Sequence, residues 1–233
     1  MNNTNQPIIN VGGTMSVTDA LRHNEEIYGL VNRRRLELHD LQTHMGRFWG
    51  RCLKNIRKED TAMAAKNLSL ALSWFFSIIN DQGIALEEAT WLKFPACCSY
   101  CDRGTCRCSP DRPTERKEVA RDRREKPRTL AGWQRLFAKV YPARKRTLDS
   151  ATSHLTEEIE EFKEAFFQNR ELYTVESWLK VEEEAADVFS CIMGVANSLS
   201  IDLAKEYSAS FFNGCHLCND SPCQCSFHDL CSV

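Results

Sequence analysis

Two groups of four cysteines with the same irregular spacing constrain this chain more than any other sequence feature. Both follow the pattern Cys-x2-Cys-x4-Cys-x-Cys, and together they contain eight of the twelve cysteines. The first quartet is Cys98, Cys101, Cys106 and Cys108, and the second quartet is Cys215, Cys218, Cys223 and Cys225. The repetition of so irregular a spacing indicates an internal repeat.

The repeat extends upstream of the cysteines. A shift of 117 residues, which superimposes the two quartets, also pairs Asn80 with Asn197, and shifts of 114 and 113 align segments nearer the start of each copy. Small changes of shift are what loop insertions between helices of constant length produce. The predicted units are 14–108 and 130–225, joined by a linker over 109–129. The linker contains three prolines and dense mixed charge, so it can contribute little core.

Apolar residues recur at helical spacing in both predicted units, which indicates helices with one buried face. Two stripes of the second unit are Leu155-Ile159-Phe162-Phe166 and Val188-Ile192-Val195-Leu199. In the first unit the pattern predicts helices near 17–31, 36–57, 61–82 and 85–93, and in the second a short helix ends before Pro142 and another covers about 202–212. The predicted fold class is all-α, with tandem helical units packed as a bundle and a small four-cysteine metal knuckle after each.

Composition excludes several classes of function. No apolar run approaches the ~20 residues that a membrane helix needs, and the polar, Asn-rich start lacks the apolar segment of a secretion signal. We therefore expect a cytoplasmic protein without a membrane partner.

The net charge of −2 argues against an electrostatic nucleic-acid binder. Nine basic and sixteen acidic residues in 129–233 leave a local excess of carboxylates that needs an explanation.

The cysteine quartets favour metal ligation over disulfides, because we do not expect the chain to be secreted. Four thiolates from CxxC and CxC pairs suit tetrahedral Zn²⁺, so each quartet is expected to hold a structural zinc ion. An iron–sulfur cluster also takes four cysteines and is the alternative. Substitute ligands near the quartets are Cys97, His216, His228 and Cys231. Cys52 and Cys191 fall on expected helices and are interpreted as core cysteines.

Acidic residues flank the two apolar stripes of the second unit. They are Glu157, Glu158 and Glu161 beside the first stripe and Glu184 and Asp187 beside the second. Packing the two helices together would gather these carboxylates, which repel one another unless cations lie between them. Hard divalent ions with oxygen ligands, Mg²⁺ or Mn²⁺, fit such a set.

The first unit is an internal control for this interpretation. Runs of glutamate on helices are more often solvated faces than metal sites. The positions of the first unit that match the acids carry Thr43, His44, Arg47, Asn67 and Leu70. The repeated scaffold therefore does not require the acids, and the second unit has them for another reason.

The acidic pattern resembles that of the MazG nucleotide pyrophosphohydrolases. Their motif is EExxE, a spacer, then ExxD on two antiparallel helices, and here Glu157-Glu158-x-x-Glu161 is followed, after 22 residues, by Glu184-x-x-Asp187. The resemblance covers about 130–212 and does not include the cysteine quartets. It implies an all-α enzyme that uses Mg²⁺ to split a nucleoside triphosphate, NTP or dNTP, into the monophosphate and pyrophosphate.

By position, the resemblance implies that Glu158, Glu161, Glu184 and Asp187 bind Mg²⁺ and that Glu157 is an accessory carboxylate or the base. Phosphate needs basic partners as well, and the candidates are Lys145, Arg146 and Lys205. Trp178, Phe167 and Tyr173 lie between the acidic helices in sequence and are candidates to stack on a base, although burial in the core is the commoner role for aromatic residues.

The first unit looks like a degenerate MazG-like copy. It lacks the acids but keeps an apolar stripe formed by Leu41, Met45, Phe48, Leu68, Leu72 and Phe75. This selective retention predicts a packing role, in which the first copy covers the second within one chain, as a pseudo-dimer, or across a homodimer. The alternative to an enzyme is a noncatalytic, zinc-stapled module that senses nucleotides or binds a protein or nucleic acid.

Overall fold

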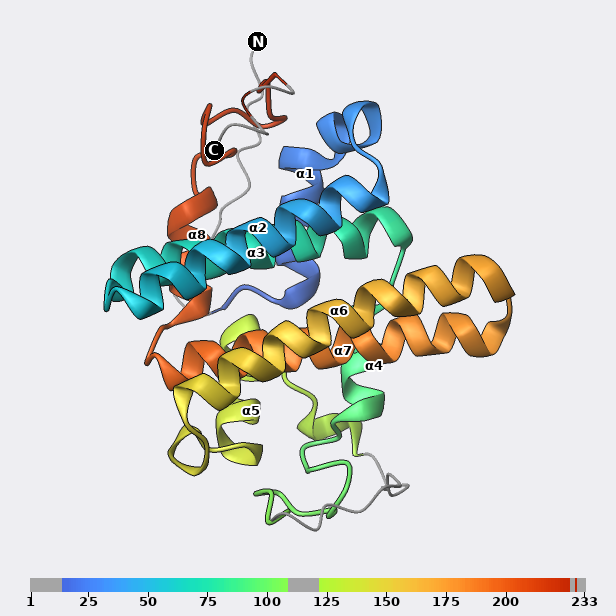
Figure 1. Ribbon diagram of the computed structural model, residues 1–233, viewed down its shortest axis with the longest axis vertical. Coiled ribbons are helices and arrows are strands. Elements are labelled where there is room, and N and C mark those ends of the chain that lie inside the picture. The colour runs from blue at the N-terminus through green and yellow to red at the C-terminus, as the bar shows by residue number, and fades with distance from the viewer. Residues whose placement is uncertain (1–13, 109–121, 227–228, 230–233) are drawn as a thin grey trace.

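The computed structural model describes residues 14–108, 122–226 and 229, which contain eight α-helices and no strand (Figure 1). The first half of the chain contains α1 (Val17–Arg35), α2 (Leu38–Arg57), α3 (Thr61–Gln82) and α4 (Leu86–Lys93). The second half contains α5 (Leu130–Val140), α6 (Leu148–Leu172), α7 (Val175–Ser198) and α8 (Leu203–Phe211). The predicted all-α class is confirmed. Most of the predicted linker, together with His228 and Cys231, lies outside the described residues.

Short polar residues set the starts of the long helices. The Thr147 side chain accepts a hydrogen bond from the Ser150 backbone N–H at 3.1 Å and caps α6, and Thr174 does the same for α7 through Ser177 at 3.1 Å. Each cap satisfies one of the backbone donors that a helix start leaves without a partner. Tyr173, at a positive φ of 49°, ends α6 and allows the tight turn into α7.

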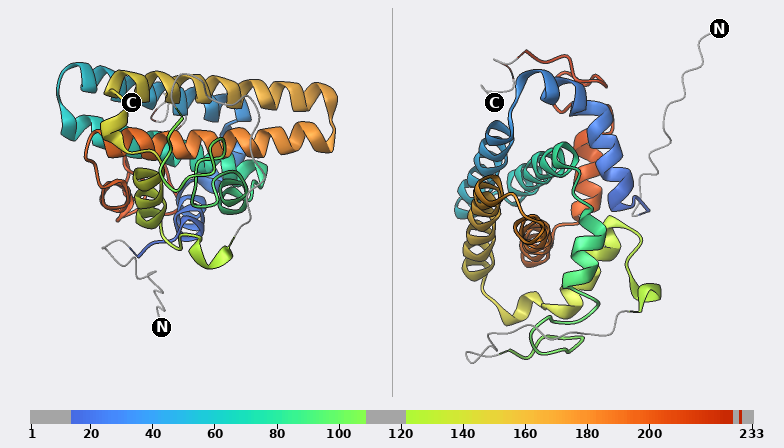
Figure 2. Two further views of the ribbon diagram at one scale, coloured as in Figure 1. Left: turned by 90° about the horizontal axis from the view of Figure 1, so that it is seen from below. Right: turned by 90° about the vertical axis from the view of Figure 1, so that its right-hand side faces the viewer.

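Two long helical hairpins, α2/α3 and α6/α7, lie side by side and form the centre of the molecule (Figure 2). Their shared face is apolar, with the rings of Phe75 and Phe162 5.8 Å apart. A polar contact also crosses this face, where Trp49 Nε1 donates to Thr156 Oγ1 at 3.0 Å. The six apolar stripe residues predicted for the first half are all buried in this core.

Two short helices are exchanged between the halves, which means that each packs against the half of the chain to which it does not belong. Helix α4 packs against α7 of the second half, and α8 packs against α3 of the first half. Each quartet comes after one of these helices in the sequence, and it also contacts the opposite half. The Cys106 N–H of the first quartet donates to the Val140 carbonyl of α5 at 2.8 Å, and the Cys223 N–H of the second quartet donates to the Ile27 carbonyl of α1 at 2.7 Å. Each half therefore completes the core of the other.

These exchanged contacts occur in matching pairs. The rings of Phe94 and Tyr141 meet edge to face at 6.2 Å, and the rings of Phe211 and Tyr28 meet in the same way at 6.1 Å. The phenylalanines are 117 residues apart and the tyrosines 113 apart, which are two of the shifts found in the sequence. Asparagine contacts pair as well, with Asn80 Nδ2 donating to the Leu21 carbonyl and Asn197 Nδ2 to the Gln134 carbonyl.

Helix α3 differs from one sequence expectation. Within the described part of the chain, it is the one continuous helix long and apolar enough to cross a membrane, although no such run was expected. In the fold, 83% of its most apolar window is buried, with α1, α2 and α8 packed around it. Helices α7 and α8 would pass the same test only as one span, and the chain bends by 102° between them. Core packing thus accounts for the apolar composition of α3.

The exchange predicts that a core mutation in α4 destabilises the second half. Trp91 is 1% exposed, and its ring lies 6.4 Å from that of Trp133 on α5. Replacing it (Trp91→Ala) should lower the free energy of unfolding by about 3–5 kcal/mol through the cavity it leaves. Leu92→Ala on the same helix, at a residue 49% exposed, should change it by less than about 0.5 kcal/mol. Chemical denaturation of the full chain measures both, and equal effects would contradict the packing described.

Candidate functional site

One cavity, of about 820 Å³, is walled by the α6/α7 hairpin, α5 and the first quartet. We call it the acidic cavity, because all five carboxylates predicted from the sequence line it. Residues of the first half form one wall, through Phe94, Ser99, Tyr100 and three of the four quartet cysteines. The site is therefore built from both halves of the chain. Its volume is within the range of pockets that hold small ligands.

Three of the carboxylates converge at one point of the cavity. Glu158, Glu184 and Asp187 each place one oxygen within 4.8 Å of the other two. Glu158 and Glu184 are only 8% and 2% exposed, and among the described residues the Oε2 atom of each has no hydrogen-bond partner. A buried acceptor without a partner costs about 1–3 kcal/mol, and more when it is charged. The arrangement fits a cation that the three carboxylates would hold.

Basic side chains offset part of this charge. Lys93, whose side chain is 2% exposed, reaches across from α4 to pair with Asp187 and donates to the Glu183 carbonyl at 3.0 Å. Lys180 pairs with Glu184. Burial raises the pKa of Asp187 to about 6, although Lys93 lowers it. Partial desolvation at the cavity wall also raises the pKa of Glu161, and the neighbouring Glu158 and Glu184 add to this. The carboxylates still repel one another after pairing.

A histidine and a cysteine extend the site by one helical turn. His154 Nε2 lies 2.8 Å from Glu158 Oε1, and its Nδ1 lies 3.6 Å from Cys191 Sγ. Hydrogen bonding to Cys191 and then to Glu158 raises the pKa of His154 to about 10. Cys191 is 5% exposed, as expected for a core cysteine, but it also lines the acidic cavity.

Of the six residues predicted to bind phosphate or to stack on a base, Arg146 alone lines the acidic cavity. Its guanidinium lies 5.7 Å from the centre of the Tyr141 ring. Lys145 is exposed and donates to the Cys106 carbonyl at 2.7 Å, so it holds the first quartet in place. Lys205 is exposed on α8, and Trp178 packs against the core near the start of α7; neither lines the cavity.

The other two aromatic candidates lie at the far turn of the α6/α7 hairpin. Phe167 is 58% exposed and Tyr173 is 90% exposed. The turn carries further exposed apolar side chains, Leu172 and Val175. None of these four residues lines the acidic cavity. Other described aromatic side chains line it, such as Tyr100.

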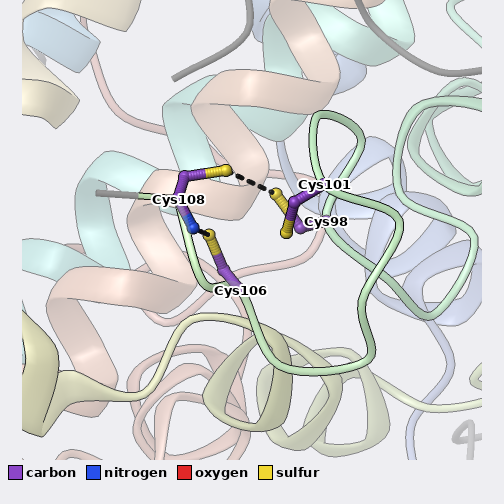
Figure 3. A group of neighbouring side chains, drawn as sticks. All are labelled: Cys98, Cys101, Cys106 and Cys108. Carbon is purple, nitrogen blue, oxygen red and sulfur yellow. Dashed lines mark hydrogen bonds between the residues drawn. The ribbon is translucent and has the colours of Figure 1, made fainter. Parts of the chain in front are cut away.

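Both cysteine quartets form compact clusters. In each, the four sulfur atoms lie within 4.8 Å of one another, and no described cysteine forms a disulfide. Cys98 Sγ lies 3.8 Å from Cys108 Sγ, and Figure 3 shows all four side chains of the first quartet directed toward one centre. Each quartet can hold a metal such as zinc. Cys97 and His216 belong to neither cluster.

The sulfur atoms of the second quartet are close enough to share protons. The hydrogen bond between Cys215 and Cys223 lowers the pKa of Cys215 and raises that of Cys223. A bound divalent metal would allow all four to ionise, because thiolate rather than thiol is the ligand.

The quartets differ in what they face. Three cysteines of the first quartet line the acidic cavity. The second quartet faces α1 of the first half, where His216 Nδ1 lies 3.0 Å from the Tyr28 hydroxyl. There the positions that match Glu158 and Cys191 in the sequence carry His44 and Trp74, whose rings stack 4.4 Å apart. The scaffold has two similar ends, and the acidic cavity forms at one of them.

Comparisons of the chain with protein-family models, with curated proteins and with solved structures find no match.

Three basic side chains that contact carboxylates of the cavity were not predicted from the sequence. Lys180 and His154 lie four residues before Glu184 and Glu158, so their helical spacing to predicted ligands was a usable signal. Lys93 comes from the other half, and no local pattern connects it with Asp187.

The converging carboxylates predict that Mg²⁺ stabilises the folded chain. At about 100 times its dissociation constant, a single bound ion adds about 2.7 kcal/mol to the free energy of unfolding. Thermal unfolding of the full chain with and without Mg²⁺ should therefore show a midpoint raised by roughly 5–11 °C. Glu184→Gln should abolish the shift, whereas Glu160→Gln, at an exposed position outside the cavity, should keep it. A shift of the same size in both variants would place the ion elsewhere.

Proposed function

We propose that this chain is a Mg²⁺-dependent nucleoside triphosphate pyrophosphohydrolase, which converts an NTP or dNTP into the monophosphate and pyrophosphate. The observation that carries the proposal is the convergence of Glu158, Glu184 and Asp187 in a cavity large enough for a nucleotide. The buried Oε2 atoms without partners support a divalent cation as the occupant of this cluster. The resemblance of the acidic pattern to MazG enzymes supports phosphate-anhydride chemistry.

The side chains around the cluster suit a polyphosphate. When bound, Mg²⁺ supplies charge neutralisation at the phosphate oxygens and a more acidic water. Glu158, Glu161, Glu184 and Asp187 would hold it; Glu161 also lines the cavity and is exposed. Arg146 and Lys180 line the cavity as well and would bind phosphate oxygens.

Glu157 is the candidate base. It lies on the cavity wall, is exposed and precedes the buried Glu158 on α6. A solvated carboxylate in this position can orient a water and accept its proton. The water oxygen would attack the α-phosphorus, the bond from that phosphorus to the bridging oxygen would break, and pyrophosphate would leave.

The first half has two roles in the proposal. It acts as a built-in partner, an intrachain pseudo-dimer, because its hairpin covers the shared apolar face and its α4 covers α7. It also closes the cavity with the first quartet, whose metal, proposed to be Zn²⁺, would hold Ser99 and Tyr100 in the wall. Tyr100 is a half-exposed aromatic residue of that wall and would stack on the nucleotide base.

Two adjacent glutamates on α6 provide a test variant of the proposed activity and its matched control. Glu160 and Glu161 are adjacent and both exposed, but only Glu161 lines the cavity. The full chain, incubated with a panel of NTPs and dNTPs and Mg²⁺, should release pyrophosphate. Glu161→Gln should lower turnover more than about 100-fold, and Glu160→Gln should leave it near the wild-type value. Nucleotide binding without any pyrophosphate release would favour the noncatalytic nucleotide-sensing module instead.

Equivalent cysteines of the two quartets test the role of the first quartet as a cavity wall. Cys101→Ser and Cys218→Ser change positions 117 residues apart, both half-buried. Each should remove one metal ion per chain and lower thermal stability, because the metal stabilises the local fold. Turnover per folded molecule should fall in Cys101→Ser alone, since only the first quartet lines the cavity. Equal turnover in the two variants would contradict this role and leave both quartets with a purely structural one.

A further inference from the structure

The seam between α6 and α7 carries three successive pairs of side chains suited to metal binding. Along the seam the pairs are Glu161 with Glu184, Glu158 with Asp187, and His154 with Cys191, each three or four residues from the next on both helices. The proposed function uses the first two pairs, which offer only oxygen. The third pair offers nitrogen and sulfur, and neither the magnesium cluster nor the quartets account for it.

The geometry of the third pair suits a metal ion. His154, Cys191 and Glu158 each offer one ligand atom within 4.8 Å of the other two. His154 Nδ1 and Cys191 Sγ lie 3.6 Å apart. Zinc bonds of about 2.05 Å to nitrogen and about 2.3 Å to sulfur, at a tetrahedral angle, place these two atoms about 3.6 Å apart. The observed Nδ1–Sγ separation therefore already suits the ion, whereas Glu158, whose Oε1 lies 2.8 Å from the other ring nitrogen, Nε2, has to turn toward Nδ1 to complete the site.

We infer that His154, Cys191 and Glu158 form a further metal site, distinct from both quartets, for a borderline divalent ion such as Zn²⁺ or Co²⁺. The donor set decides the class of metal, because imidazole and thiolate favour zinc and cobalt over magnesium. With three protein ligands, the fourth position of the ion opens into the acidic cavity, as in catalytic rather than structural zinc sites.

Burial and access support the site independently of these distances. Glu158 is 8% exposed, and its Oε2 has no hydrogen-bond partner among the residues described. Cys191 is 5% exposed. The His154 side chain is 42% exposed and lines the cavity, so an ion can reach the buried donors from solvent. Glu158 then belongs to both metal sites, which couples the new site to the carboxylate cluster.

The first half again provides an internal comparison. The positions that correspond to His154, Glu158 and Cys191 carry Asp40, His44 and Trp74. There the His44 ring stacks on Trp74 at 4.4 Å and fills the space. The helical scaffold therefore packs without this donor set, and the set occurs only where the acidic cavity lies.

Zinc counting in the full-length protein tests the inference. Wild type, Cys191→Ser, His154→Gln and Cys52→Ser are equilibrated with Zn²⁺ in excess Mg²⁺, which occupies the carboxylate cluster. Unbound ions are removed by gel filtration and zinc per chain is measured by elemental analysis. Cys52 is the matched control, because it is also a single buried cysteine on a long central helix, α2, away from the cavity.

Wild type and Cys52→Ser should hold one zinc ion per chain more than Cys191→Ser and His154→Gln. The His154 substitution keeps the test decisive if Cys191→Ser fails to fold, because the histidine side chain is partly exposed. The same zinc content in all four proteins would overturn the inference and leave a hydrogen-bonded chain of Cys191, His154 and Glu158. The count needs no turnover, so it is decided separately from the proposed pyrophosphohydrolase activity.

Discussion

The exchange of short helices between the two halves is the packing constraint on which the rest of the structure depends. Helix α4 covers α7, and α8 covers α3. Because each quartet follows its helix, the first quartet is placed beside the carboxylates of the other half and becomes a wall of the acidic cavity. Without the exchange, the α6/α7 hairpin would present its acids to open solvent, where carboxylates stay separately hydrated and bind cations weakly.

Buried charge sets the chemistry of the cavity. Glu158 and Glu184 are almost fully buried, and the two ammonium groups that pair with the cluster neutralise it only in part. Lys93 comes from the half that lacks the acids, so the first half contributes charge as well as apolar surface. A buried carboxylate cluster is tolerated when cations complete it. Along the seam between α6 and α7, the candidate metal ligands change from oxygen atoms to nitrogen and sulfur.

Local patterns predicted the helices and the acidic set well, because both depend on residues close together in sequence. The span 61–82 matches α3 at both ends, and all five predicted acids line one cavity. What could not be predicted depends on contacts between distant segments. The Lys93–Asp187 pair and the quartet wall arise from the exchange, and no period in the sequence encodes it. Trp178 and Lys205 fit the expected chemistry, but neither lines the cavity.

The exchange also sets an order of events during synthesis. Helix α3, apolar enough to resemble a membrane span, leaves the ribosome well before α8, which packs against it and begins at Leu203. Most of the chain must therefore be made before either half can close its core, and the contacts that close it are far apart in sequence. Such long-range closure slows folding and leaves apolar surface open to aggregation in the interval. Until α8 has been made, the nascent first half lacks the helix that packs against α3 in the fold.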